Sequence, residues 1–286
     1  MNRISISQAW SYATSFFNGQ MANHAIVLIG IGIVVPLVLQ FTLGGSAQLL
    51  DPTTLASGGE AGMIAAFGAT AFLVGIVNFI LQTGSYFASW RIGLTSGGEP
   101  LGSAIGYGLI AALPVLLLTI AVVLVFGIIG FIIAGSAMMT MASGQGNPGD
   151  LAAMGVGVLI FLPLFLLFLV WLAARFCCTG PVMADRRSYN VLSGLGESWR
   201  MTAASQWKLV AYFILIVVAL MVIGLILSMI VGVSVFATGS VPSSGSLLAL
   251  ILASALMGIP MAYLQVGVPA GIYRALGRSD ASEVFA

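Results

Sequence analysis

Six long stretches of this sequence have no charged side chain in their central portion, and this feature most constrains how the chain can fold. A helix needs about 20 consecutive apolar residues to cross a hydrocarbon core of roughly 30 Å. Because each stretch reaches that length, we expect an all-α, polytopic membrane helix bundle. The six expected transmembrane helices cover residues 24–44, 61–85, 103–134, 152–176, 208–237 and 246–273.

The composition of the chain agrees with a bilayer environment. Hydrophobic residues make up 60% of the sequence and charged residues 6%, whereas about a quarter of the residues of a typical soluble domain are charged. A net charge of +1 gives no overall field that would attract nucleic acid. We therefore expect membrane lipids as partners, and another membrane protein or complex as a further possibility, but no nucleic acid.

The basic residues predict the orientation of the spans. None of them falls in the first, third or fifth loop, where the only charged residues are Asp51, Glu60 and Asp150. Positive charge collects on the cytoplasmic side of membrane proteins, so both termini are expected in the cytoplasm of a bacterial cell, with the chain in its inner membrane. The nine basic residues are Arg3, Arg91, Arg175, Arg186, Arg187, Arg200, Lys208, Arg274 and Arg278.

The regions outside the spans are short. The outer loops are rich in Gly, Ser and Pro and read as turns, so residues 1–286 are expected to form a single membrane domain. The first 24 residues contain no apolar core of a signal peptide, and insertion is expected to depend on the internal segments.

Two cytoplasmic stretches have apolar residues at helical spacing, and they predict amphipathic helices over residues 5–17 and 187–201. Such helices lie in the headgroup plane of a bilayer. A second interpretation is that both pack on the cytoplasmic ends of the spans without touching lipid, because either arrangement needs the same apolar face. The expected interfacial anchors are Trp10, Trp199 and Trp207.

One short skeleton occurs three times at the expected cytoplasmic ends of spans: "TGSYFASWR", "TGPVMADRR" and "VGVPAGIYR". Each copy has Gly, a small residue four positions later and Arg three positions after that, an arrangement that puts all three on one helix face. Small residues allow close helix crossing, and the Arg then reaches the headgroups. The skeleton residues are Gly84, Ala88 and Arg91; Gly180, Ala184 and Arg187; and Gly267, Gly271 and Arg274.

The spacing of the copies suggests a repeated unit. Their glycines are 96 and 87 residues apart, which is consistent with a helical hairpin present three times around a pseudo-threefold axis. The alternative is that small residues and Arg are simply common at cytoplasmic helix ends.

The sequence offers little chemistry for catalysis. Its single histidine, His24, has no neighbouring histidine or paired carboxylates, and it is expected to be a capping or interfacial residue. No serine lies in a Gly-x-Ser-x-Gly elbow. We therefore expect no catalytic, metal-binding or cofactor-binding residues, and no enzyme.

Residues 173–215 resemble the membrane domain of bacterial glycerophosphoryl diester phosphodiesterases and related uncharacterised six-span proteins. The resemblance rests on "AARF" leaving a span, Pro181, an amphipathic helix, "ESWRMT", and Trp207 at the start of the next span. In those enzymes catalysis belongs to a separate soluble barrel, which this sequence lacks. The resemblance therefore implies the non-catalytic membrane part alone.

Two functional hypotheses follow. The leading one is a non-catalytic inner-membrane protein that binds lipid or a membrane-protein partner, as a scaffold or an accessory subunit. The alternative is a transporter or channel for a small uncharged or amphiphilic molecule, which needs no buried charge.

Overall fold

The computed structural model describes residues 5–43, 60–95, 99–142, 163–236 and 244–284, and all regular structure within these ranges is helical. The expected all-α class is therefore confirmed for this part of the chain. The elements are α1 (Ile6–Ser15), α2 (Met21–Ala25), the π-helix η1 (Ile26–Val34), α3 (Val35–Leu43), α5 (Glu60–Leu94), α6 (Leu101–Ala142), a helix over residues 163–176, α8 (Thr179–Asp185), α9 (Val191–Thr202), the 3₁₀ turn η2 (Ala203–Ser205), α10 (Gln206–Phe236) and α11 (Ser244–Val284).

Five stretches among the described residues are long and apolar enough to cross a membrane. They correspond to the first five expected spans, although residues 152–162 of the fourth lie outside the described ranges. The sixth expected span, residues 246–273, is helical within α11 but is not one of the five. The five stretches are Met21–Gln40, Phe72–Leu94, Leu101–Ile128, Pro163–Asp185 and Val191–Leu225.

The apolar residues of α6 show which solvent these helices require. Residues 122–126 are five consecutive apolar side chains, each between 45% and 62% exposed, so every face of the helix is apolar and uncovered. In water such a surface would be a large aggregation-prone patch, whereas in a bilayer lipid chains cover it at no cost.

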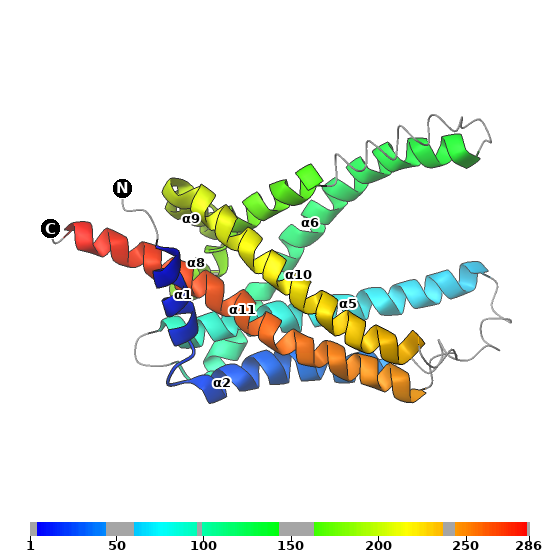
Figure 1. Ribbon diagram of the computed structural model, residues 1–286, viewed down its shortest axis with the longest axis horizontal. Coiled ribbons are helices and arrows are strands. Elements are labelled where there is room, and N and C mark those ends of the chain that lie inside the picture. Colours follow the sequence, from blue (N-terminus) through cyan, green and yellow to red (C-terminus); the bar gives the residue numbers. More distant parts are fainter. Residues whose placement is uncertain (1–4, 44–59, 96–98, 143–162, 237–243, 285–286) are drawn as a thin grey trace.

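The helices converge at one end of the molecule and separate at the other (Figure 1). The N- and C-terminal ends lie near each other at the convergent end, with α1, α8 and α9. From there α6 and the helix over residues 163–176 run in one direction, while α5, α10 and α11 run in another. We call the convergent end, where Arg91, Glu99, Arg187 and Arg274 lie, the polar end.

Helix α5 extends nine residues beyond the expected boundary at residue 85, so the first skeleton copy is part of a helix and not the start of a loop. The expected boundary at residue 85 was placed where the run of apolar residues ends. At the polar end, however, protein takes over from lipid as the surroundings of the helix. Phe87, Ala88 and Trp90 are buried there against neighbouring elements, which keeps the helix folded to Leu94.

The fourth expected span ends at residue 176, where the helix that begins at residue 163 also ends, but the separate helix that follows was not predicted. Cys177 and Cys178 form a turn, and α8 follows as a separate helix of seven residues. The expected amphipathic helix over residues 187–201 begins later, at Val191, because the Asn190 side chain accepts a hydrogen bond from the backbone N–H of Ser193 at 3.1 Å and caps the first turn.

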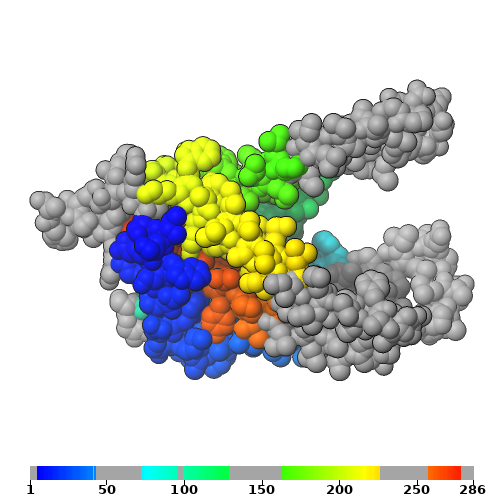
Figure 2. Space-filling view, viewed as in Figure 1, coloured from blue at the N-terminus to red at the C-terminus, as the bar shows by residue number. Residues whose placement is uncertain are grey.

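The first expected amphipathic helix, over residues 5–17, is α1, and its apolar face is divided. Ala9 and Ala13 are buried against α11, whereas Ile6 and Trp10 are 38% and 45% exposed. Figure 2 shows α1 (blue) on the same face of the molecule as α10 (yellow) and α11 (orange). Docking on protein thus accounts for the small residues of α1 and leaves its tryptophan on the outside.

Gly108 on α6 provides a test of the closest helix crossing. A Cβ at Gly108 would lie 2.2 Å from the carbonyl oxygen of Gly84 and 2.8 Å from the backbone nitrogen of Ala88, whereas a Cβ at Gly106 would meet nothing within 4 Å. Gly108→Ala should therefore lower the free energy of unfolding by about 1–3 kcal/mol. Gly106→Ala, the matched control, should change it little or raise it through helix propensity. Thermal unfolding in detergent, followed by circular dichroism, measures the stability of both variants. Equal effects of the two substitutions would contradict the close crossing of α5 and α6.

Candidate functional site

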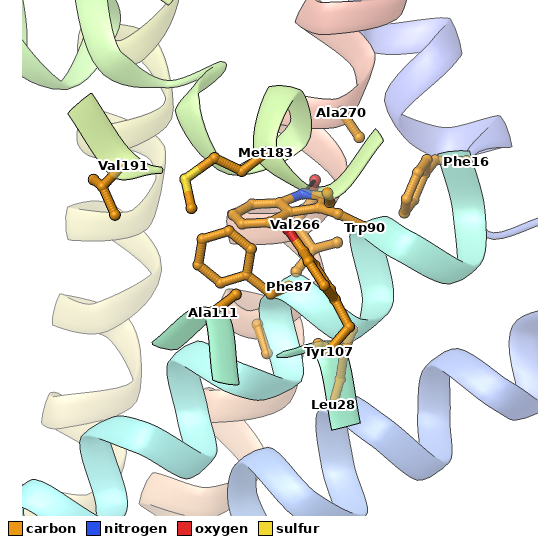
Figure 3. Close-up of a cluster of buried hydrophobic side chains, with 12 residues drawn as sticks. Phe16, Leu28, Phe87, Trp90, Tyr107, Ala111, Met183, Val191, Val266 and Ala270 are labelled. Atoms are coloured by element: carbon orange, nitrogen blue, oxygen red, sulfur yellow. Dashed lines mark hydrogen bonds between the residues drawn. The ribbon is translucent and has the colours of Figure 1, made fainter. Parts of the chain in front are cut away.

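Trp90 is the centre of the buried cluster at the polar end (Figure 3). Its indole N–H donates a hydrogen bond to the Val266 carbonyl oxygen at 2.9 Å, which ties α5 to α11. Its ring packs edge-on against Phe87, with the ring centres 5.4 Å apart, and Met183 of α8 lies on the other side. Three elements that are distant in sequence therefore meet at one side chain.

The glycines of the three skeleton copies lie against different neighbours. A Cβ at Gly84 would be 3.2 Å from the Cα of Leu109 on α6, and one at Gly180 would be 2.0 Å from Cζ3 of Trp90. Cβ atoms at Gly267 and Gly271 would meet α1, the latter 2.3 Å from the Ala9 carbonyl oxygen. The alanines between are also buried, with Ala88 1% exposed and Ala184 fully covered.

Arg91 joins the end of α5 to the end of α8. Its Nη1 donates to the carbonyl oxygens of Ala184 and Asp185 at 2.9 Å and 3.0 Å, and its Nε forms an ion pair with Glu99. The last carbonyls of a helix have no partner within it and carry partial negative charge, so a guanidinium is well placed there.

Arg274 likewise joins α11 to α5 through a hydrogen bond to a backbone carbonyl. It donates to the Gly93 carbonyl oxygen at 2.6 Å, and its guanidinium lies 5.1 Å from the ring centre of Phe16. Arg274 and Tyr273 also line an open pocket of about 530 Å³ between α1 and α11, whose lining is part polar and part apolar.

Arg187 departs from the geometry that the skeleton predicts. Because α8 ends at Asp185, Gly180 and Arg187 do not share a helix face as the corresponding residues of α5 and α11 do. The backbone of Arg187 has a φ of 52°, and the N–H groups of Arg187 and Ser188 donate to the carbonyls of Ala184 and Met183, which is a Schellman helix end. Glycine usually occupies this position, so an arginine here costs conformational energy.

The strained backbone directs the Arg187 side chain towards α6. Its Nη2 lies 3.7 Å from Glu99 Oε1 and donates to Ser103 Oγ at 3.2 Å. Ser103 in turn donates to Glu99 at 2.6 Å. Glu99 is therefore shared between the arginines of the first two skeleton copies, a link that the sequence pattern did not predict because Glu99 lies outside the skeleton.

The environment of Glu99 alters its acidity. Burial raises the pKa of the carboxyl group, but hydrogen bonds from Ser103 and Arg91 and the positive charges of Arg91 and Arg187 outweigh burial. The pKa of Glu99 is therefore held below its ordinary value of 4.5, and the carboxylate stays ionised at neutral pH.

His24 is not the capping or interfacial residue that its isolation in the sequence suggested. It is fully buried, with Nδ1 2.7 Å from Ser89 Oγ, and its ring packs against Phe16 and Phe17. Its hydrogen-bonding partner lies 65 residues away, and no local pattern marks the pair. No group of three or more His, Cys, Asp or Glu residues that could hold a metal ion occurs in the described ranges.

The three expected anchor tryptophans all have exposed rings. Trp10, Trp199 and Trp207 are 45%, 40% and 71% exposed. Trp199 of α9 also covers Arg175, whose guanidinium carbon lies 3.9 Å from the centre of its ring. Arg175 itself is only 3% exposed.

An apolar cavity of about 190 Å³ lies where the helix over residues 163–176 meets α10 and α11. Apart from the Cys177 thiol and Gln265, its lining is entirely apolar. The lining residues are Ala173, Cys177, Phe213, Ile216, Leu220, Met261, Leu264, Gln265, Val268 and Pro269.

Comparison with known protein families assigns the chain to a family. A family described as a domain of unknown function (DUF7847) matches residues 102–276, which extend from the first turn of α6 into α11 and include the apolar cavity, Arg175 and α9. The chain belongs to this family. No curated protein matches the chain, and no solved structure does. The match leaves α1 to α5, and with them Trp90 and the first skeleton copy, outside the family region.

The shared carboxylate gives the polar end a pH dependence. Because the folded-state pKa of Glu99 is lowered, its interactions stabilise the protein above pH 4.5 and are lost as the pH falls below that value and through the folded-state pKa. Glu99→Gln should cost about 1.5–3 kcal/mol of unfolding free energy at neutral pH, as expected for hydrogen bonds to a charged group. The difference between wild type and variant should shrink in acid. Thermal unfolding at several pH values measures it, and a difference that does not change with pH would contradict this assignment.

Proposed function

We propose that this chain is a non-catalytic integral protein of the bacterial inner membrane that binds membrane lipid. The apolar cavity beside the helix over residues 163–176 is the observation that carries the proposal. Enclosed cavities of about 150 Å³ with apolar linings stay free of water and accept apolar molecules. This cavity of about 190 Å³ is open to the protein surface, so surrounding lipid can reach it directly.

The position of the cavity favours a lipid chain as the occupant. Two of the three surrounding helices, the helix over residues 163–176 and α10, present exposed apolar side chains, including Leu166, Leu167 and Leu215 at 52%, 51% and 65% exposure. Lipid therefore surrounds the cavity walls in a bilayer. A lipid tail that enters it exchanges contact with other tails for contact with fixed side chains, and dispersion contacts then favour binding.

The polar end supports the orientation that the charges predict. The exposed tryptophans occur on α1, α9 and the start of α10, and an aromatic ring with a polar edge suits the headgroup region. With this end in the cytoplasm, α11 would supply a sixth crossing and the protein would have both termini inside. The shared use of glycines at helix crossings is compatible with a threefold hairpin repeat, which we retain as part of the proposal.

The resemblance to the membrane domains of glycerophosphoryl diester phosphodiesterases supports a membrane-embedded role without catalysis, although the family match makes no link to those enzymes. A membrane-protein partner, for which the chain would act as scaffold or accessory subunit, is compatible with lipid binding. The alternative hypothesis of a transporter or channel differs in its consequences, because it requires movement of a molecule across the bilayer.

Filling the cavity tests the proposal. Ala173→Trp should occupy the space between the three helices and weaken retention of phospholipid through purification by about tenfold, equivalent to 1.4 kcal/mol. Native mass spectrometry of the protein released from mild detergent measures the retained lipid. Ala121→Trp on the exposed surface of α6 is the matched control and should retain lipid as the wild type does.

Two results would count against lipid binding at the cavity. One is equal retention by both tryptophan variants. The other is rapid release of a small uncharged amphiphile from vesicles that contain the wild-type protein but not from empty vesicles, which would favour the transporter hypothesis.

A further inference from the structure

Arg175 is a buried cation, and two of its three guanidinium nitrogens lack partners. The residue is 3% exposed, and its Nε and Nη1 atoms are buried without a hydrogen-bonding partner. A guanidinium stays charged in proteins, so it cannot relieve the cost of burial by losing a proton. A buried charge is normally paired, and an unpaired one requires an explanation.

The acidic residues nearest in sequence are already engaged. Glu197, on the same helix as Trp199, pairs with Arg186 and Arg200. Asp185 accepts a hydrogen bond from the Tyr273 hydroxyl at 2.7 Å. Within the part of the chain that the structure describes, Arg175 has no ion pair.

The surroundings of Arg175 hold it in place. Its carbonyl oxygen accepts hydrogen bonds from the hydroxyls of Ser198 and Thr202 at 2.8 Å and 3.2 Å, which fixes the helix end against α9. The Trp199 ring stacks on the guanidinium at 3.9 Å, and Trp171 and Phe176 pack around that ring. The side chain is thus positioned in advance for a partner.

We propose that Arg175 binds the phosphate group of an anionic membrane phospholipid, with Trp199 as the stacking cover. The planar fork of a guanidinium matches the oxygens of a phosphate, and both partners gain strength in a site from which water is excluded. Arg175 is the second-last residue of the helix over residues 163–176, where the fourth expected span ends and the headgroup region is expected to begin. Phospholipid phosphates are the anions that a bilayer places there.

The assignment rests on the proposed lipid-binding function but concerns a different site. Ala173 and Cys177 line the apolar cavity, and each lies two residues from Arg175 on the same stretch of chain, so their side chains point to other faces than that of Arg175. Loss of the phosphate site would leave binding of a lipid tail in the cavity intact, and the two proposals can fail separately.

Thermal stability in neutral detergent, with and without phosphatidylglycerol, tests the phosphate site. A ligand that binds only the folded state raises its stability. The wild-type midpoint should rise by about 5 °C with phosphatidylglycerol. Arg175→Met should fold in neutral detergent, because the change removes an unpaired buried charge, but its rise should be no larger than that given by diacylglycerol, which has the same tails without the phosphate. Arg200→Gln, which removes an exposed arginine of the same region, should respond like the wild type.

Each other outcome is decisive. An Arg175→Met variant that responds to phosphatidylglycerol as the wild type does would overturn the proposal. A variant that unfolds in neutral detergent would also overturn it, since Arg175 would then stabilise the fold without lipid. A second measurement replaces phosphatidylglycerol by inorganic phosphate at matched ionic strength. If the wild-type midpoint rises with inorganic phosphate but not with phosphatidylglycerol, the ligand of Arg175 is not a lipid, and the proposal is overturned.

Discussion

The contact between Gly180 and the Trp90 ring is the interaction on which the polar end depends. Helices in a bilayer gain nothing by exchanging lipid for another apolar surface, so their association depends on close approach and on hydrogen bonds. A side chain at position 180 would displace the ring, since a Cβ would lie 2.0 Å from it. With the ring in place, Trp90 reaches the Val266 carbonyl and the adjacent Arg91 reaches the carbonyls at the end of α8.

The need for close helix approach also separates the tightly packed polar end from the apolar cavity. Around Trp90 the elements are packed so closely that glycines and alanines form many of the contacts, which leaves arginine side chains to satisfy helix ends and to share Glu99. Farther along the helices the packing opens, and the apolar cavity lies among α10, α11 and the helix over residues 163–176. We therefore assign anchoring to the packed end and binding of a lipid tail to the region where the helices begin to separate.

Sequence reasoning identified the helices because burial in lipid depends mainly on local hydropathy, which a single chain displays directly. It misplaced the end of α5 at Leu94, where protein replaces lipid as the surroundings, and the start of α9 at Val191, which the Asn190 side chain caps. The skeleton arginines were identified from their spacing, but their partners were not. The pairing of His24 with Ser89 and the left-handed backbone of Arg187 both depend on tertiary packing, and spacing along the chain does not encode either.

The proposed lipid contacts depend on how the protein is oriented in the bilayer. The polar end must face the cytoplasm. Single cysteines at Leu55, Gly146, Val241 and the exposed Gly196, introduced after replacement of Cys177 and Cys178 by alanine, report it directly. A membrane-impermeant maleimide added outside spheroplasts should label the first three positions, and Gly196→Cys only after the membrane is permeabilised. Labelling of Gly196→Cys in intact spheroplasts, or protection of any of the first three positions, would contradict the account.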